Sequence, residues 1–166
     1  MNPYAAAVRR LGRYRAVSWA LSRVLPPIDA RFVRHRRSPT SFGTGFPLCY
    51  LTTTGRRTGE PRTVPLLHVA DGGRVVLLAS NWGGRHHPAW ALNLEANPEA
   101  RVTIGGVEHY YAARRATSEE RLRYWAEAVR VWPGYEDYRA RASREIRVFV
   151  LEPAEPEWSS EPNESS

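Results

Sequence analysis

The sequence predicts an α+β domain made mainly of antiparallel strands, which form a small barrel or a strongly coiled sheet with helices around it. Two pairs of apolar runs are each joined by a glycine turn, Asp71-Gly72-Gly73 and Gly105-Gly106, and this is the pattern of a β-hairpin. A late apolar run, Ile146–Leu151, predicts one more strand. The chain lacks the alternation of strands and crossover helices that a Rossmann fold requires.

The composition is that of one globular domain with appendages. Of the 166 residues, 42% are hydrophobic and 25% are charged, which is ordinary for a soluble protein. The single cysteine, Cys49, excludes an internal disulfide, and its place in an apolar run indicates an inert core residue. No apolar run is long enough to span a membrane, and the N-terminus lacks the pattern of a signal peptide. We therefore expect a cytoplasmic location.

The positive charge is concentrated at the start of the chain. The formal net charge is +7, and all 24 basic residues are arginine. Residues 1–40 contain nine arginines and one acid, whereas residues 41–166 contain fifteen arginines and sixteen acids. An enzyme acting on nucleic acid would more often spread its basic surface over the body, so we expect no nucleic-acid partner.

The first forty residues are expected to form a basic helical arm. Residues 4–25 have apolar side chains at helical spacing, with most arginines off that stripe, and Pro26-Pro27 ends the helix. One interpretation is a solvated arm packed on the body. The alternative is a peripheral contact with an anionic membrane surface, to which a basic amphipathic helix can bind.

The body is expected to occupy residues 41–152. Its first strands are predicted at Pro47–Thr54, Thr63–Val69 and Val75–Ser80. The loop Asn81–Pro88 follows, and Pro88 is expected to open a short helix, Ala89–Ala96, because proline is favoured at the start of a helix.

The second half of the body adds a hairpin, two helices and the late strand. The hairpin strands are Ala100–Ile104 and Val107–Arg114. Thr117 and Glu120 have the spacing of a capping box and predict a helix start. The apolar face of this helix is expected to consist of Leu122, Trp125, Ala126 and Val129. Pro133-Gly134 ends it, a short helix follows over Tyr135–Arg141, and residues 153–166 are an acidic segment expected to be disordered.

The loop from Gly55 to Arg62 is the strongest candidate for ligand binding. Arg56, Arg57 and Arg62 surround a turn with two glycines, and guanidinium groups bind phosphate or carboxylate bidentately. Successive N–H groups in such a turn can also form an anion nest. A plain basic hairpin turn is the alternative, and the loop is not a P-loop because the Gly-Lys-Ser/Thr ending is absent.

Two further segments could take part in binding. Ser80 and Asn81 lie at the end of a strand with glycines beyond, where they could hydrogen-bond a heterocycle. Trp132, Tyr135 and Tyr138 surround a helix break and could wall an apolar pocket, although core packing explains them equally well. His86 and His87 are adjacent and lack further ligands at suitable spacing, so we expect no metal site.

Four segments together resemble the deazaflavin-dependent nitroreductase family, the actinobacterial quinone and nitro-compound reductases that use coenzyme F420. In chain order they are LTTTGRRTGEPRTVPL, LLASNWGG, HPAWALNLEANPEARV and WPGYEDY. The resemblance covers about residues 45–152. It implies a split β-barrel like that of FMN-binding oxidases, which holds the deazaflavin cofactor.

The resemblance also implies which residues bind the cofactor. Arg56, Arg57 and Thr58 match positions at the phosphate and tail. The groove, the ring system and a further side of the site correspond to Arg62, Thr63, Val64, Pro65, Leu66, Leu67, Leu78, Ala79, Ser80, Asn81, Ala89, Trp90, Ala91, Leu92 and Asn93. Tyr135 matches a tyrosine over the ring, while Trp132 and Tyr138, with Tyr135, match the substrate pocket.

The implied activity is hydride transfer from reduced coenzyme F420 to a quinone-like or nitroaromatic acceptor. The expected catalytic residues are Ser80, Tyr135 and Tyr138, of which Ser80 or Tyr135 would hydrogen-bond the developing oxyanion or supply a proton. The chain has Asn81 where some members have lysine, and Trp132 where they have tyrosine, which disfavours bulky nitro-drugs more than quinones. If the acceptor is menaquinone, the basic arm would dock the enzyme on the membrane. The alternatives are an FMN-dependent split-barrel oxidoreductase and a non-catalytic deazaflavin-binding or membrane-interaction module.

Overall fold

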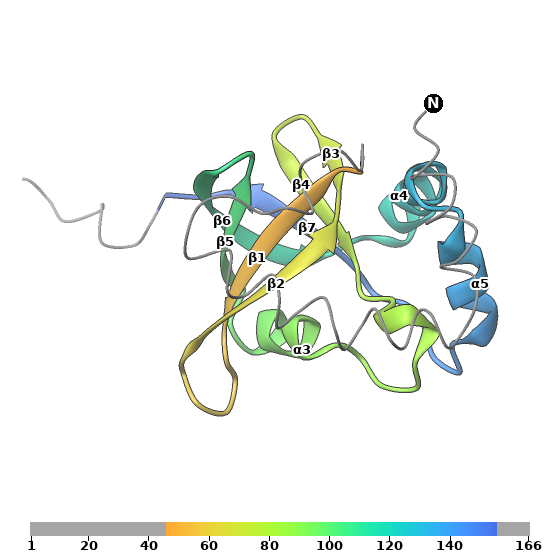
Figure 1. Cartoon of the computed structure of the whole chain (residues 1–166), viewed down its shortest axis with the longest axis horizontal. Helices are drawn as coiled ribbons and strands as arrows, with labels where there is room; N and C mark the ends of the chain where they lie inside the picture. Colours follow the sequence, from red (N-terminus) through yellow and green to blue (C-terminus); the bar gives the residue numbers. More distant parts are fainter. Residues whose placement is uncertain (1–45, 156–166) are drawn as a thin grey trace, which may run out of the picture.

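Seven strands form one antiparallel sheet in the computed structural model, which describes residues 46–155 (Figure 1). Along the sheet the order is β2-β1-β5-β6-β7-β4-β3, and every neighbouring pair is antiparallel. The strands are β1 Leu48–Thr54, β2 Pro61–Leu67, β3 Val69–Asp71, β4 Arg74–Leu78, β5 Glu99–Ile104, β6 Val107–Arg115 and β7 Val148–Pro153. Both predicted glycine hairpins are confirmed, as β3–β4 and β5–β6.

The sheet curls into a half-barrel. Its two edge strands, β2 and β3, are consecutive in the chain and separated by His68 alone, so the two edges of the sheet meet at one corner. There the His68 N–H donates to the Pro47 carbonyl over 3.0 Å. The predicted small barrel of the split-barrel type is therefore confirmed, and β2 pairs with β1 alone within residues 46–155.

The core has two layers because β4 and β7 are buried on both faces. Val75, Leu77, Phe149 and Leu151 point into the barrel. The alternate residues of the same strands point outward and are covered by helices; they are Val76, Leu78, Val148 and Val150. This double burial explains why both strands are continuous apolar runs and not alternating ones.

Three α-helices and one 3-10 turn complete the described part of the chain. They are η1 Asn81–Gly83, α3 Ala89–Ala96, α4 Ser118–Val131 and α5 Gly134–Arg141. Helix α3 contributes Trp90, Ala91 and Leu94 to the inner layer, while α4 and α5 lie beside each other over the outer layer (Figure 1). The bounds predicted for α3 are confirmed.

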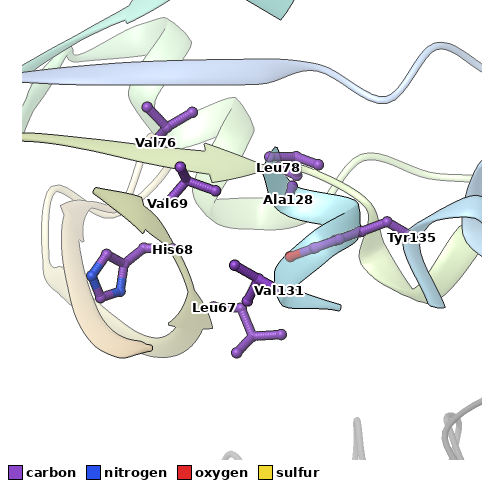
Figure 2. A pocket seen from close by; sticks show the side chains of 8 residues that line it. All are labelled: Leu67, His68, Val69, Val76, Leu78, Ala128, Val131 and Tyr135. Carbon is purple, nitrogen blue, oxygen red and sulfur yellow. The ribbon is translucent and has the colours of Figure 1, made fainter. Parts of the chain in front are cut away.

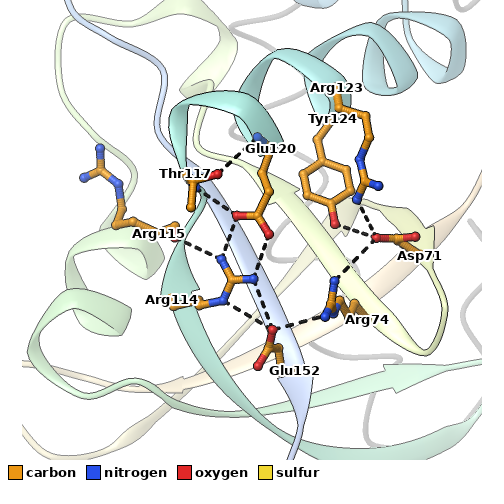
Figure 3. Close-up of polar contacts among 9 residues, drawn as sticks. All are labelled: Asp71, Arg74, Arg114, Arg115, Thr117, Glu120, Arg123, Tyr124 and Glu152. Atoms are coloured by element: carbon orange, nitrogen blue, oxygen red, sulfur yellow. Dashed lines mark hydrogen bonds and ion pairs between the residues drawn. The ribbon is translucent and has the colours of Figure 1, made fainter.

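Helix α4 begins as predicted, but its expected apolar face is confirmed only for Trp125 and Val129, which pack against the core, and is wrong for Leu122 and Ala126. The Thr117 hydroxyl accepts from the Glu120 N–H, and the Glu120 carboxylate accepts from the Thr117 N–H, which confirms the capping box. Leu122, however, is 71% exposed, and Ala126 is exposed as well. The helix is rotated because Tyr124 packs inward, where its hydroxyl donates to the Asp71 carboxylate on β3 (Figure 3).

Strand bounds differ modestly from those predicted. β2 begins at Pro61 and ends at Leu67, and β4 ends at Leu78, so Ala79 and Ser80 already belong to the following loop. β7 extends to Pro153, which pairs with Tyr111. The predicted basic arm and nearly all of the acidic segment lie outside the described residues. No helix within residues 46–155 is long and apolar enough to cross a membrane.

Candidate functional site

The turn between β1 and β2 presents two exposed arginines whose guanidinium groups have no partner in the described part of the chain. Arg56 and Arg57 form neither a hydrogen bond nor an ion pair through their side chains among residues 46–155, whereas Arg62 binds Glu60 over 3.2 Å. Both are therefore available to an anionic ligand, in agreement with the sequence prediction that this turn binds anions.

The predicted anion nest in this turn is wrong. The Gly55 N–H donates to the Glu60 carbonyl, and the N–H groups of Thr58 and Gly59 donate to the Gly55 carbonyl. The Arg56 N–H donates to the Asn93 side chain over 3.1 Å. Because these amides are used within the fold, recognition of an anion falls to the arginine side chains.

Asn93 ties this turn to helix α3. Its side chain is 5% exposed, and its Nδ2 donates to the Thr53 hydroxyl over 3.0 Å while its Oδ1 accepts from the Arg56 N–H. The sequence predicted Asn93 as a cofactor contact, and the structure gives it a bridging position between the helix and the turn.

The other predicted residues of α3 divide between surface and interior. Ala89 is exposed and Leu92 is half-buried. Trp90 and Ala91 point into the barrel, where the Trp90 ring meets Phe149 edge to face at 5.6 Å. The side chain of Trp90 thus belongs to the core.

Strand β2 connects the arginine turn with the second half of the site. Thr58, Arg62 and Thr63 are exposed at its beginning, and the four residues Val64–Leu67 are half-buried. Its seven residues span about 20 Å at the usual rise of a strand. Since β2 is an edge strand, its backbone can approach a ligand along this length.

Leu67, at the far end of β2, lies at a shallow and mostly apolar pocket of about 170 Å³, a volume that includes open solvent and leaves no enclosed space for a water molecule (Figure 2). The pocket is lined by Leu67, His68, Val69, Val76, Leu78, Ala128, Val131 and Tyr135. The structure thereby brings together the ends of β2 and β4 with α5, three segments that the sequence prediction assigned to one site. In Figure 2 the Tyr135 hydroxyl points toward Val131 and the lining of the pocket, whereas the His68 ring points away from Tyr135.

Tyr135 keeps its phenolic proton. Its side chain is 6% exposed, and this burial, with a smaller effect of Tyr138, raises the pKa of Tyr135 well above its ordinary value. The hydroxyl is therefore a hydrogen-bond donor at any physiological pH. Burial likewise raises the pKa of the Cys49 thiol to about 12, which leaves that cysteine unreactive.

Trp132 and Tyr138 pack behind Tyr135. The Trp132 Nε1–H donates to the Tyr138 hydroxyl over 3.1 Å, and the rings of Tyr135 and Tyr138 meet edge to face at 5.9 Å. All three side chains are buried, but Tyr135 alone lines the pocket of Figure 2. The sequence left open whether this cluster packs in the core or walls a pocket. In the structure Trp132 and Tyr138 pack in the core, and Tyr135 lines the pocket.

The loop that follows β4, residues 79–87, has a constrained conformation. Asn81, Trp82 and Gly83 have φ angles of 45°, 55° and 76°, which lie in the left-handed region that non-glycine residues seldom adopt. The Asn81 Nδ2 donates to the His86 carbonyl over 2.9 Å, and the Trp82 ring contacts Tyr138 at 5.8 Å. Ser80 is half-buried at the start of the loop and Asn81 is exposed.

One residue that contacts this loop, Arg144, was not found by sequence reasoning. It lies outside all four segments of the resemblance, yet its guanidinium group contacts residues 79–87 from the stretch between α5 and β7. As for metals, residues 46–155 contain no group of three or more His, Cys, Asp or Glu side chains arranged to hold an ion.

Comparison with known proteins gives consistent results. The family model for F420H(2)-dependent quinone reductases matches residues 30–153. A Mycobacterium tuberculosis protein that carries the family's name is 31% identical over 115 residues, covering 67% of this chain and 97% of the relative. A second F420H(2)-dependent quinone reductase from that species is 31% identical over 113 residues, covering 63% and 72%. The solved structure of an F420-H2 dependent reductase is 37% identical, with a TM-score of 0.60 and coverage of 64% and 94%.

Proposed function

This chain belongs to the F420H(2)-dependent quinone reductase family, and we propose that it is an oxidoreductase that transfers a hydride from reduced coenzyme F420 to a quinone. One structural observation carries the proposal. Strand β2 leads from Arg56 and Arg57, whose side chains have no partner among residues 46–155, to a mostly apolar pocket that is lined in part by the protonated phenol of Tyr135.

The residues at both ends of β2 fit a deazaflavin cofactor. Coenzyme F420 has a phosphate and an oligoglutamate tail, and both are anions that the free guanidinium groups of Arg56 and Arg57 would hold. Its flat ring suits the half-buried residues Val64–Leu67 and the buried end of β4 at Leu78. When bound, the reduced cofactor supplies the hydride, while the protein supplies binding and orientation.

Tyr135 and Ser80 are the groups that act on the acceptor in this proposal. A quinone that gains a hydride develops negative charge on oxygen, which a hydrogen-bond donor in an apolar site stabilises strongly. The phenol of Tyr135 is such a donor because burial keeps it protonated. The half-buried Ser80 hydroxyl, in the loop that follows β4, is the second donor we propose.

The site is better suited to a quinone acceptor than to a bulky nitroaromatic acceptor. Trp132 stands where some family members have tyrosine, and its indole N–H is already bonded to Tyr138. The aromatic cluster therefore offers one phenol, that of Tyr135, to the pocket. We propose quinones as the main acceptor class and small nitroaromatic compounds as a secondary one.

Titration of the full chain with oxidised coenzyme F420 and, in parallel, with FMN tests the cofactor assignment. We expect binding of the deazaflavin that weakens about tenfold or more in the Arg56→Ala/Arg57→Ala variant. The matched control, Arg121→Ala/Arg130→Ala, removes two charges from α4 and should leave the affinity unchanged. Preferential binding of FMN, or binding of neither molecule, would contradict the assignment.

Turnover separates an enzyme from a binding module. The reduced cofactor and a water-soluble naphthoquinone are mixed with the protein, and oxidation of the cofactor is followed by absorbance. We expect turnover that saturates in quinone. Tight cofactor binding without reduction of any quinone would instead favour a non-catalytic deazaflavin-binding module.

We further propose that the basic segment 1–40 brings the enzyme to an anionic membrane, where lipid-soluble quinones reside. Its nine arginines against one acid support this proposal, since each basic residue near an anionic surface contributes about 1 kcal/mol. In the full chain, replacing Arg31, Arg34 and Arg36 by glutamine should reduce sedimentation with anionic vesicles. The same change at Arg101, Arg121 and Arg130 serves as the control, and equal losses in both variants would overturn the idea.

A further inference from the structure

Arg144 makes an unusual set of contacts with the loop 79–87. Its Nε donates to the Gly84 carbonyl over 3.2 Å, and its Nη2 donates to the carbonyls of Ala79 and Ser80 over 3.2 and 3.1 Å. Its Nη1 also reaches the Ala79 carbonyl and lies 3.0 Å from the Nδ1 of His87. One half-buried guanidinium group thus connects the first and last parts of the loop.

This arrangement differs from that of Arg114 and Arg147, which are also half-buried. Those two arginines form ion pairs with glutamates, whereas Arg144 forms no ion pair within residues 46–155. Its donors go to main-chain carbonyls and to an imidazole nitrogen. A cation placed on backbone acceptors fixes the path of the chain more than it balances charge.

The loop needs such support because its backbone is strained. Asn81 and Trp82 hold positive φ angles, a conformation that non-glycine residues adopt at a cost in free energy and that persists only where surrounding contacts impose it. Gly83 lies directly against α5, where an added Cβ would come within 3.0 Å of the Tyr138 carbonyl oxygen. The loop is therefore compressed between α5 on one side and Arg144 on the other.

We infer that Arg144 is a positioning residue that holds the loop 79–87 in this strained conformation, and thereby fixes the position of Ser80, two residues beyond the pocket residue Leu78. This restraint of the loop by Arg144, which we call the clamp, is inferred from contacts within the protein and does not depend on the proposed function. Its consequence for the cofactor rests on the proposed function, because Ser80 and Asn81 border the proposed ring site.

Hydrogen exchange tests the clamp without any cofactor. In the full chain, Arg144→Gln removes the guanidinium N–H donors that bind the loop. We expect the amide hydrogens of the peptide that covers residues 79–87 to exchange about tenfold faster or more. The amides of Gly83 and Gly84, which donate to Ser80 and Asn81, should account for this change. Peptides from β5 and β6 should be unaffected, which shows that the fold is intact.

Two variants complete the exchange experiment. Arg144→Lys keeps the cation but loses the guanidinium N–H donors, so exchange of the loop should be intermediate between wild type and Arg144→Gln. Arg101→Gln removes an arginine from a surface ion pair with Glu108 and should match wild type. Unchanged exchange of the loop in Arg144→Gln, with the protein folded, overturns the inference.

Cofactor titration then tests the consequence for the site. We expect the dissociation constant of coenzyme F420 to rise about tenfold in Arg144→Gln and less in Arg144→Lys. Faster loop exchange with unchanged cofactor affinity would refute the positioning role toward the cofactor. If wild type itself does not bind coenzyme F420, the proposed function fails, while the exchange result still decides whether Arg144 clamps the loop.

Discussion

Tyr135 carries a buried phenol whose hydroxyl has no hydrogen-bond partner among residues 46–155. A donor at a pocket wall that has no such protein partner can be satisfied by a ligand oxygen. Because burial raises its pKa, this group is suited to donate a hydrogen bond and unsuited to act as a base. Tyr135 and His68 are the two lining residues with polar side chains, and the other six are apolar.

Replacing Tyr135 by phenylalanine should therefore lower quinone reduction with little effect on folding. We expect kcat to fall about tenfold or more, since the donor that acts on the acceptor oxygen is lost. The cofactor dissociation constant should change by less than about twofold, because the ring remains. Steady-state kinetics and fluorescence titration measure the two quantities. Tyr110→Phe, on the exposed side of β6, is the control, and undiminished turnover in Tyr135→Phe removes the residue from this role.

Asn93 should matter for both stability and cofactor affinity. Asn93→Ala removes two hydrogen bonds of a buried side chain and leaves the Arg56 N–H without its partner. We expect a loss of about 1–3 kcal/mol in the free energy of unfolding, measured with urea, together with weaker binding of coenzyme F420. Asn97→Ala breaks one local bond to the Glu99 N–H and should cost less, with unchanged affinity. Equal effects of the two variants would show that the Asn93 bridge has no special role.

At the scale of elements, the loop 79–87 and helix α5 form one unit. The two are joined by the contact of Trp82 with Tyr138 and by the close approach of Gly83 to the Tyr138 backbone. The glycine is required twice at this position, once for its φ of 76° and once for the missing Cβ. The conformation of the loop therefore sets the distance between Ser80 and the aromatic cluster.

Gly83→Ala should consequently destabilise the protein more than an alanine at a glycine with open space around it. Gly59 is the matched control, since its φ is 70° and an added Cβ would meet nothing within 4 Å. Both variants bear the strain of a positive φ, so the difference between them isolates the clash with Tyr138. We expect Gly83→Ala to cost about 1–3 kcal/mol more in urea unfolding. Equal costs would show that the loop shifts away from α5 without penalty.

The elements themselves were largely predictable from local signals. The bounds of α3, the capping box of α4 and both glycine hairpins follow from turn and cap chemistry within a few residues. The buried face of α4 was not predictable, because a hydrogen bond between Tyr124 and Asp71, distant in sequence, decides the rotation of the helix. A hydrophobicity pattern alone favoured Leu122, which is exposed.

At the scale of the whole molecule, the candidate site was predictable only in part. The arginine turn and the pocket residue Tyr135 lie in two of the four segments that resemble the family, so the resemblance identified them. The use of the turn's amides within the fold and the role of Arg144 depend on contacts between residues far apart in sequence. Such contacts leave no mark in local spacing, and the three-dimensional structure is needed to find them.

A network of arginines and acids joins the elements of the outer layer (Figure 3). The Arg114 guanidinium group binds Glu120 in α4 over 2.7 and 2.8 Å and Glu152 in β7 over 3.1 Å. Arg74 extends the network from Glu152 to Asp71. The hydrogen bonds from Arg114 lower the pKa of Glu120 to about 2, and the Tyr124 hydroxyl, followed by Arg123, lowers the pKa of Asp71.

The network predicts how stability depends on acid. A carboxyl group whose pKa is lower in the folded state stabilises the protein above its unfolded pKa of about 4.3, and this contribution disappears as the pH falls toward the folded pKa. For Glu120 the window therefore extends from about pH 5 down to about pH 2. Glu120→Gln cannot be deprotonated, so the free energy of unfolding, measured with urea at about pH 7 and about pH 3, should fall less in this variant than in wild type. Glu119→Gln, in the same turn of α4 but outside the network, should retain the wild-type slope. If Glu120→Gln and wild type lose the same stability over this range, the network does not link α4 to the sheet through charge.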